Sequence, residues 1–269
     1  MLHHRIIGTG KPILVLHGVA LDHRYMMDVM EPGLRASGAY KRIYLDMPGH
    51  GQSPARDDIR SQDDLLNAVL DFVKNVIPDE PFGVVGLSRG SYIARGLVYL
   101  MSERIFGVAL IAPGGGPSSD PDRLPTPIVL QPDDTIRSEL ADTEIWAHEN
   151  MSVAQRWDIV EKRRQIVAPA RALFDADQDA RIMSAFDFSF AREEQDFVFD
   201  APSLIVAGRQ DSISGYLDAV DLMHRFPRAT LAVLDTAGHA LAWERPDVFH
   251  ALVRDWLARL PHREATEPS

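Results

Sequence analysis

Short runs of apolar residues recur along the chain and alternate with longer stretches in which apolar positions are three or four residues apart. Within the short runs, polar and apolar side chains do not alternate, which is typical of strands buried on both faces of a parallel sheet. These runs predict strands at residues 13–16, 42–46, 82–87, 105–112, 203–207 and 230–234. Residues 2–7 add a candidate edge strand.

The stretches between these strands have the spacing of amphipathic helices. Leu65, Val69, Phe72 and Val76 recur on one face of a helix predicted over residues 61–76. Similar spacing predicts helices at 91–101, 215–226 and 247–260. The last begins after Pro246, which a helix start tolerates. The succession of strand and helix predicts an α/β fold with a mostly parallel, doubly wound sheet.

One segment interrupts this succession, and we call residues 113–200 the insertion. It opens with a turn cluster, contains no clear strand, and has helix-like spacing at 135–150, 152–174 and 179–190. Its 18 acidic and 9 basic residues carry most of the net charge of the 269-residue chain, which is −11. We therefore expect a core formed by residues 1–112 and 201–260, a helical cap at 113–200, and a flexible tail at 261–269.

The amino-acid composition excludes some classes of function and argues against others. The chain has no cysteine, which excludes disulfides, thiolate metal sites and a cysteine nucleophile. The negative net charge weighs against nucleic-acid binding, and no apolar run approaches the 18 to 20 or so residues that span a bilayer. The first 12 residues lack the apolar run of a signal peptide, so we expect a cytoplasmic protein.

The same survey predicts no cofactor and no metal. Gly8-Thr9-Gly10 is too short for a dinucleotide or phosphate loop, and no H-E-x-x-H pair is present. We expect a small-molecule substrate as the binding partner, and the sequence carries no signal for an oligomeric state.

The sharpest motif is Gly86-Leu87-Ser88-Arg89-Gly90, which matches G-x-S-x-G between a predicted strand and a predicted helix. In that context the turn raises a serine hydroxyl above the sheet, and glycine neighbours avoid a clash. Ser88 is therefore the candidate nucleophile. The alternative is a glycine-rich turn whose serine only caps the helix.

A nucleophilic serine needs a base and an acid that orients the base. Asp211 and His239 each follow a predicted strand, in the order serine, acid, histidine that this kind of sheet uses. The alternative for Asp211 is a helix cap, and Asp235 is too close in sequence to His239 to reach around it. The remaining histidines lie near the termini (His3, His4, His262), on predicted helices (His148, His224, His250), in loops before Ser88 (His23, His50) or at the end of the first predicted core strand (His17).

An oxyanion hole needs two backbone N–H groups that point at one site. Arg89, directly after the nucleophile, supplies one. His17-Gly18-Val19, after the first core strand, supplies the other through the N–H of Val19.

Together these motifs resemble the α/β-hydrolase superfamily. His17-Gly18 resembles its oxyanion motif, Asp46 to Ser53 its D-x-P-G-x-G-x-S loop, and residues 86–90 its nucleophile elbow. Gly208 to Asp211 and Ala237 to His239 resemble its acid turn and histidine loop. The resemblance implies a helical cap at the insertion and a mostly structural role for the His50 loop. A serine at the elbow argues against dehalogenases and epoxide hydrolases, which have an aspartate there.

We therefore expect a carboxylesterase-like serine hydrolase that cleaves an ester-like bond of a small or medium, mainly apolar substrate through an acyl-enzyme. The insertion contains eight aromatic residues, and we expect some of them to line the substrate pocket. One alternative is a C–C bond hydrolase of the meta-cleavage type, which would bind a substrate carboxylate with arginines of the insertion. Arg156, Arg163, Arg164 and Arg171 are available for that. The other is a non-catalytic receptor on the same fold.

Overall fold

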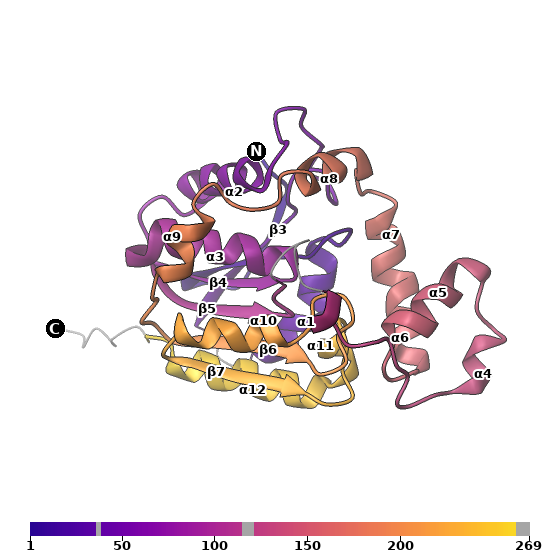
Figure 1. The fold of residues 1–269 in the computed structure, drawn as a ribbon. Coiled ribbons are helices and arrows are strands. Elements are labelled where there is room, and N and C mark those ends of the chain that lie inside the picture. The colour runs from indigo at the N-terminus through magenta and orange to yellow at the C-terminus, as the bar shows by residue number, and fades with distance from the viewer. Residues whose placement is uncertain (36–38, 115–120, 262–269) are drawn as a thin grey trace.

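The structure is a computed structural model that describes residues 1–35, 39–114 and 121–261, and its seven strands form one sheet (Figure 1). The strand order is β1-β3-β2-β4-β5-β6-β7; β1 is antiparallel to β3 and every other neighbouring pair is parallel. The strands are β1 (His4–Ile7), β2 (Lys11–Leu16), β3 (Tyr40–Leu45), β4 (Phe82–Leu87), β5 (Ile105–Ile111), β6 (Ser203–Gly208) and β7 (Ala229–Leu234). The predicted α/β fold is confirmed, and the predicted edge strand is β1.

Helices cover both faces of the sheet, so each face is the floor of an apolar core. One core joins the sheet to α2, α3 and α10, and the other joins it to α1, α11 and α12. The helices are α1 (His23–Leu34), α2 (Gln62–Val76), α3 (Arg89–Met101), α4 (Asp134–Arg137), α5 (Asp142–Met151), α6 (Trp157–Lys162), α7 (Ala168–Arg171), α8 (Ala176–Met183), α9 (Ala191–Asp196), α10 (Leu217–Asp221), α11 (Leu241–Glu244) and α12 (Pro246–Arg259).

Helix α1 was not predicted from the sequence, and it contains Pro32, a residue that breaks helices, near its end. It begins at Asp22, whose side chain accepts the N–H of Arg24 at 2.9 Å. Gly33 allows a close approach to α12, since a Cβ there would lie 2.8 Å from Val253 Cγ1. Tertiary packing therefore outweighs the local signal.

The helical insertion between β5 and β6 is confirmed, but its helices are shorter than the pattern predicts. The stretch 152–174 divides into α6, a π-helical segment (Arg163–Val167) and α7. Its first residues are extended instead, because Ala154 pairs with Gln131 in a parallel bridge and Val153 accepts the N–H of Leu130 at 2.9 Å. Similarly, residues 215–226 form only α10 and one 3₁₀ turn (Leu222–His224).

The insertion is fixed to the core at α8. The Gln178 side chain donates to the carbonyl of Pro48 at 2.8 Å and accepts the N–H of Arg56 at 2.7 Å, and the next residue, Asp179, forms an ion pair with Arg89. Helices α5, α6 and α7, which come before this anchor in the chain, lie to one side of the sheet, at the right of Figure 1.

In the described ranges, no helix has both the length and the apolar character needed to cross a membrane. Most of the predicted tail, residues 262–269, lies outside the described residues.

Candidate active site

Ser88 stands on a sharp turn between β4 and α3. Its φ of 54° and ψ of −120° lie in a region that costs a non-glycine residue about 1–3 kcal/mol. The flanking glycines permit this turn: a Cβ on Gly86 would lie 2.2 Å from the carbonyl oxygen of Gly90, and a Cβ on Gly90 would lie 2.5 Å from that of Leu16. Gly86 is therefore required by the turn itself, and Gly90 by the close approach of α3 to β2.

Backbone contacts hold Ser88 in this conformation, and its hydroxyl has no hydrogen-bond partner among the described residues. Its N–H donates to the carbonyl of Ile111 at 2.9 Å, and its own carbonyl accepts the N–H of Ser91 at 2.8 Å. The Ser88 hydroxyl does not cap α3, in contrast to the alternative considered from the sequence. Ser91 Oγ instead accepts the N–H of Ile111 at 3.1 Å and donates to the carbonyl of Gly86 at 2.6 Å, which fixes the base of the turn.

His239 and Asp211 form a direct pair on the loops after β7 and β6. His239 Nδ1 lies 2.9 Å from Asp211 Oδ2, while Asp211 Oδ1 accepts the backbone N–H groups of Ile213 at 2.9 Å and Ser214 at 3.0 Å. Asp211 is fully buried. An ionised carboxylate only accepts, so Nδ1 carries the proton and Nε2 offers a lone pair.

The charge state of His239 follows from these neighbours. Burial alone would lower the pKa of His239, but the charge and hydrogen bond of Asp211, with the charge of Glu244, raise that pKa above its ordinary value of 6.5. Ser88 and His239 border the same cavity, and no hydrogen bond joins them within the described residues. Such contacts are often long in a free enzyme and shorten when substrate binds.

His17, which the sequence identifies only as part of a motif, orients the peptide between Gly18 and Val19. Its Nε2 accepts the N–H of Met47 at 3.0 Å, so the proton is on Nδ1, which donates to the carbonyl of Gly18 at 2.7 Å. Burial lowers the pKa of His17, which keeps the ring neutral. In a trans peptide the N–H points opposite to the carbonyl, so the N–H of Val19 points away from this ring.

That peptide and Ser88 border one cavity, and a Cβ on Gly18 would lie 3.1 Å from Ser88 Cβ. Within the described part of the chain, neither the N–H of Val19 nor that of Arg89 donates a hydrogen bond. Both are therefore free to bind an oxyanion beside Ser88. The Arg89 side chain has a separate role, because it pairs with Asp179.

The sequence profile of the alpha/beta hydrolase fold matches residues 11–246, which is most of the chain. The chain belongs to the α/β-hydrolase family. It is 24% identical to 2-hydroxy-6-oxononadienedioate/2-hydroxy-6-oxononatrienedioate hydrolase 2 of Pseudomonas putida, over 95% of this chain and 91% of that one. It is 25% identical to a pimeloyl-[acyl-carrier protein] methyl ester esterase of Neisseria meningitidis, over 92% and 93%. An α/β superfamily hydrolase from Oenococcus oeni has a similar structure, with a TM-score of 0.85, 22% identity and 95% coverage of each chain.

In this α/β-hydrolase, Ser88 and His239 border a cavity of about 470 Å³ between the core and helices α5 to α7. Its apolar wall comes from both parts, with Leu21, Leu87, Met151, Val160, Val167 and Trp243 among its members. Tyr25 and Trp243 of the core are its aromatic residues, and none of the eight aromatic residues of the insertion lines it, contrary to our expectation. Phe186 and Phe188, for example, pack on Tyr92 of α3 instead.

The insertion supplies the charged side chains of the cavity wall. The sequence alone could not show which of them face the cavity. Arg163, Arg164 and Arg171 line it, together with Glu144 and His148. Glu144 pairs with Arg164 at 2.6 Å, whereas Arg163 donates to the carbonyls of residues 147 and 151. His148, which lies on a predicted helix, is only 2% exposed, and neither ring nitrogen has a partner among the described residues.

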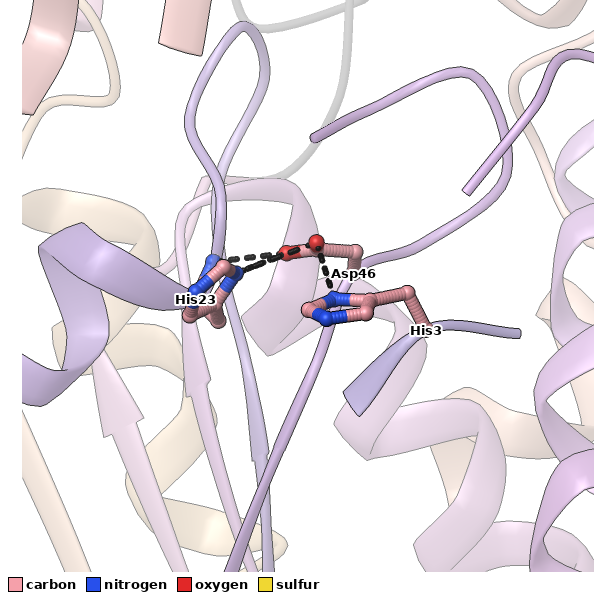
Figure 2. A group of neighbouring side chains, drawn as sticks. All are labelled: His3, His23 and Asp46. Carbon is pink, nitrogen blue, oxygen red and sulfur yellow. Dashed lines mark hydrogen bonds and ion pairs between the residues drawn. The ribbon is translucent and has the colours of Figure 1, made fainter. Parts of the chain in front are cut away.

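Figure 2 shows the one group of side chains in the described chain that could hold a metal ion: His3, His23 and Asp46. Hydrogen bonds account for it. Asp46 Oδ2 accepts from His3 Nδ1 at 2.7 Å and from the N–H of Gln52 at 3.0 Å, and Oδ1 accepts from the N–H and Nδ1 of His23 at 2.8 and 2.9 Å. Burial alone would raise the pKa of Asp46, but these bonds hold it well below its usual range. The cluster braces the loop before α1, which carries Val19.

His50 is also structural in character. It is 2% exposed, its Nδ1 lies 3.1 Å from the carbonyl of Pro48, and its ring packs between His17 and Phe174. Burial lowers the pKa of His50 to about 3, so the ring stays neutral.

Proposed function

We propose that this α/β-hydrolase is a serine hydrolase that cleaves an ester-like bond through an acyl-enzyme. Ser88 is the nucleophile, His239 the general base, and Asp211 the group that orients His239. One observation carries the proposal: a serine held in strained backbone and a histidine bonded to a buried carboxylate border the same cavity. These are the parts that nucleophilic catalysis by serine requires.

The reaction begins when Ser88 Oγ attacks the carbonyl carbon and its proton moves to Nε2 of His239. The N–H groups of Val19 and Arg89 stabilise the oxyanion that forms. Breakage of the bond between the carbonyl carbon and the alcohol oxygen leaves an acyl-Ser88, and His239 passes its proton to the alcohol. Water then attacks the acyl carbon while His239 takes a proton from it. The bond between the acyl carbon and Ser88 Oγ breaks, His239 returns the proton to Ser88 Oγ, and the acid product leaves.

The cavity supports a small or medium substrate. Its volume of about 470 Å³ is within the range of pockets that enclose small molecules, about 300–1,000 Å³. The apolar wall suits the apolar part of an ester. We propose that the insertion acts as a cap and sets substrate choice, since α5 to α7 supply most of the wall opposite Ser88.

A second candidate is the hydrolysis of a C–C bond in a substrate that carries a carboxylate. Arg163 and Arg171 support it, because both line the cavity and neither forms an ion pair with a described residue. Burial lowers the pKa of Arg163, although the charge of Glu244 acts in the opposite direction. The Pseudomonas putida relative is named for a dioate substrate, and the Neisseria meningitidis relative for an ester. The same triad serves both reactions.

The test is a substrate panel combined with active-site labelling. A fluorophosphonate should add one label, on the peptide that contains Ser88, and Ser88→Ala should abolish both labelling and turnover. The panel contains p-nitrophenyl butyrate, the p-nitrophenyl hemiester of glutaric acid, and a 2-hydroxy-6-oxo-dienoate with a C–C bond to cleave. Labelling or turnover that persists in Ser88→Ala would refute the proposal.

The panel also separates the two candidates. Preference for the butyrate ester supports the esterase, and preference for the dienoate supports the C–C hydrolase. If the arginines bind a carboxylate, Arg163→Gln should raise KM for the two anionic substrates by about tenfold and leave KM for the butyrate unchanged, since one charged hydrogen bond contributes roughly 1.5–3 kcal/mol. Arg164→Gln is the matched control, because Glu144 already neutralises that side chain.

A further inference from the structure

Glu244 is a second carboxylate near His239, besides Asp211, and no sequence motif pointed to it. It ends α11, five residues after His239, and it is only 3% exposed. Its Oε2 accepts the N–H of Gly238 at 2.6 Å, and its Oε1 accepts the N–H groups of Val153 at 2.6 Å and Ala154 at 3.2 Å. One side chain thus joins the residue before the histidine to the insertion.

A second contact reinforces the same junction from the other side. Arg156 of the insertion donates to the carbonyls of Trp243 at 2.9 Å and Glu244 at 3.2 Å. Space at the junction is short as well, since a Cβ on Gly238 would lie 3.1 Å from Val153 Cγ2. The extended residues 153–154 of the insertion and the histidine loop therefore form one hydrogen-bonded unit, although about 85 residues separate them in the chain.

The charge of Glu244, which belongs to this unit, also acts on His239, the proposed base. Asp211 and Glu244 are the carboxylates whose charges act on His239, and both raise its pKa. Glu244 is in turn influenced by the charge of Arg163, and its own charge acts on Arg156 and Tyr25. The pKa of Glu244 is raised above its ordinary value, because burial outweighs its three N–H donors and the charge of Arg163, which lower it.

We propose that Glu244 is a positioning residue for His239 and that it links the placement of the insertion to the placement of the catalytic base. The inference rests on the proposed role of His239 as that base. It predicts that a substitution at Glu244 changes kcat and the charge environment of His239 together, because the same carboxylate holds the histidine loop in place and carries a charge that acts on His239.

The experiment compares Glu244→Gln and Glu244→Asp with the parent, on the best ester of the panel, across pH. The glutamine keeps the shape but turns an N–H₂ toward at least one backbone N–H, so the loop shifts. We expect kcat to fall about 10- to 100-fold, as for other small displacements of catalytic groups, with a smaller change in KM. Because a negative charge is lost, the acidic limb of the kcat/KM profile should move to lower pH.

The Glu244→Asp variant separates the effect of side-chain length from the effect of charge. It keeps the carboxylate but is too short to contact both segments, so kcat should fall while the acidic limb stays closer to that of the parent than in Glu244→Gln. Asp235→Asn is the matched control: Asp235 lies in the same loop, is exposed, and contacts the side chains of Gln210 and Thr236. It should leave kcat and the limb unchanged.

The outcomes are distinguishable from failure of the proposed function. If Ser88→Ala retains activity, the serine-hydrolase proposal fails whatever Glu244 does. If Ser88→Ala is inactive but a folded Glu244→Gln keeps the kcat and acidic limb of the parent, only the role of Glu244 is refuted. Should Glu244→Gln not fold, Glu244→Asp decides: parent-like kcat overturns the inference, and a lower kcat with an unshifted limb supports it.

Discussion

Replacement of Asp211 by asparagine removes one charge and almost no volume, and it tests the orientation of His239. The two backbone N–H groups that donate to Asp211 Oδ1 at 2.9 and 3.0 Å determine how the new amide sits. Turning the N–H₂ toward them would leave two buried donors unpaired, at a cost of about 1–3 kcal/mol each. The amide oxygen therefore stays with these N–H groups, and the N–H₂ faces His239.

That orientation reverses the tautomer of the histidine. Nδ1 must then accept a hydrogen bond, so the proton moves to Nε2, where it blocks transfer from Ser88. Loss of the correct tautomer in a triad of this type lowers kcat by about 10⁴-fold, which corresponds to about 5.4 kcal/mol of activation free energy. Stability should change by only about 1–2 kcal/mol, because the other hydrogen bonds of the turn remain.

The assay is steady-state hydrolysis of p-nitrophenyl butyrate, with thermal unfolding as a check of the fold. Asp235→Asn is again the control, since it makes the same chemical change on an exposed side chain nearby. A folded Asp211→Asn variant with a kcat within tenfold of the parent would show that another group orients the base. A severe effect of Asp235→Asn would point to the same conclusion.

Two further predictions follow from the same geometry. Because the pKa of His239 is raised above 6.5 and the base acts only when neutral, kcat/KM should increase with pH along an acidic limb centred above about 6.5; a limb centred below pH 6 in a pH–rate profile contradicts this. Gly90→Ala should destabilise the fold by about 3 kcal/mol, because its Cβ would lie 2.5 Å from a backbone oxygen of β2 that cannot rotate away. Gly96→Ala on the same helix is the control, since its Cβ would meet only side chains that can shift. Equal melting temperatures for the two variants would refute the argument.

The sequence by itself determined the sheet and the order of the candidate triad. Buried parallel strands read as unbroken apolar runs, so their ends could be located, and side chains just after those ends meet at one edge of the sheet. Ser88, Asp211 and His239 were selected in this way. The G-x-S-x-G pattern also carried part of its own structural cause, since the clash that requires Gly86 is with Gly90 inside the motif, whereas the clash that requires Gly90 is with Leu16 of β2.

Only the tertiary structure decided which side chains line the cavity and which groups hold His239 in place. Whether Arg163, His148 or an aromatic residue of the insertion faces Ser88 depends on how short helices pack, and amphipathic spacing is the same for a helix that faces a pocket and one that faces the core. His17 and Glu244 gain their roles only through backbone groups far away in the chain: the N–H of Met47 for one, and the N–H groups of Val153 and Ala154 for the other. A backbone N–H carries no sequence signature, so contacts of this kind become visible only when the chain is folded.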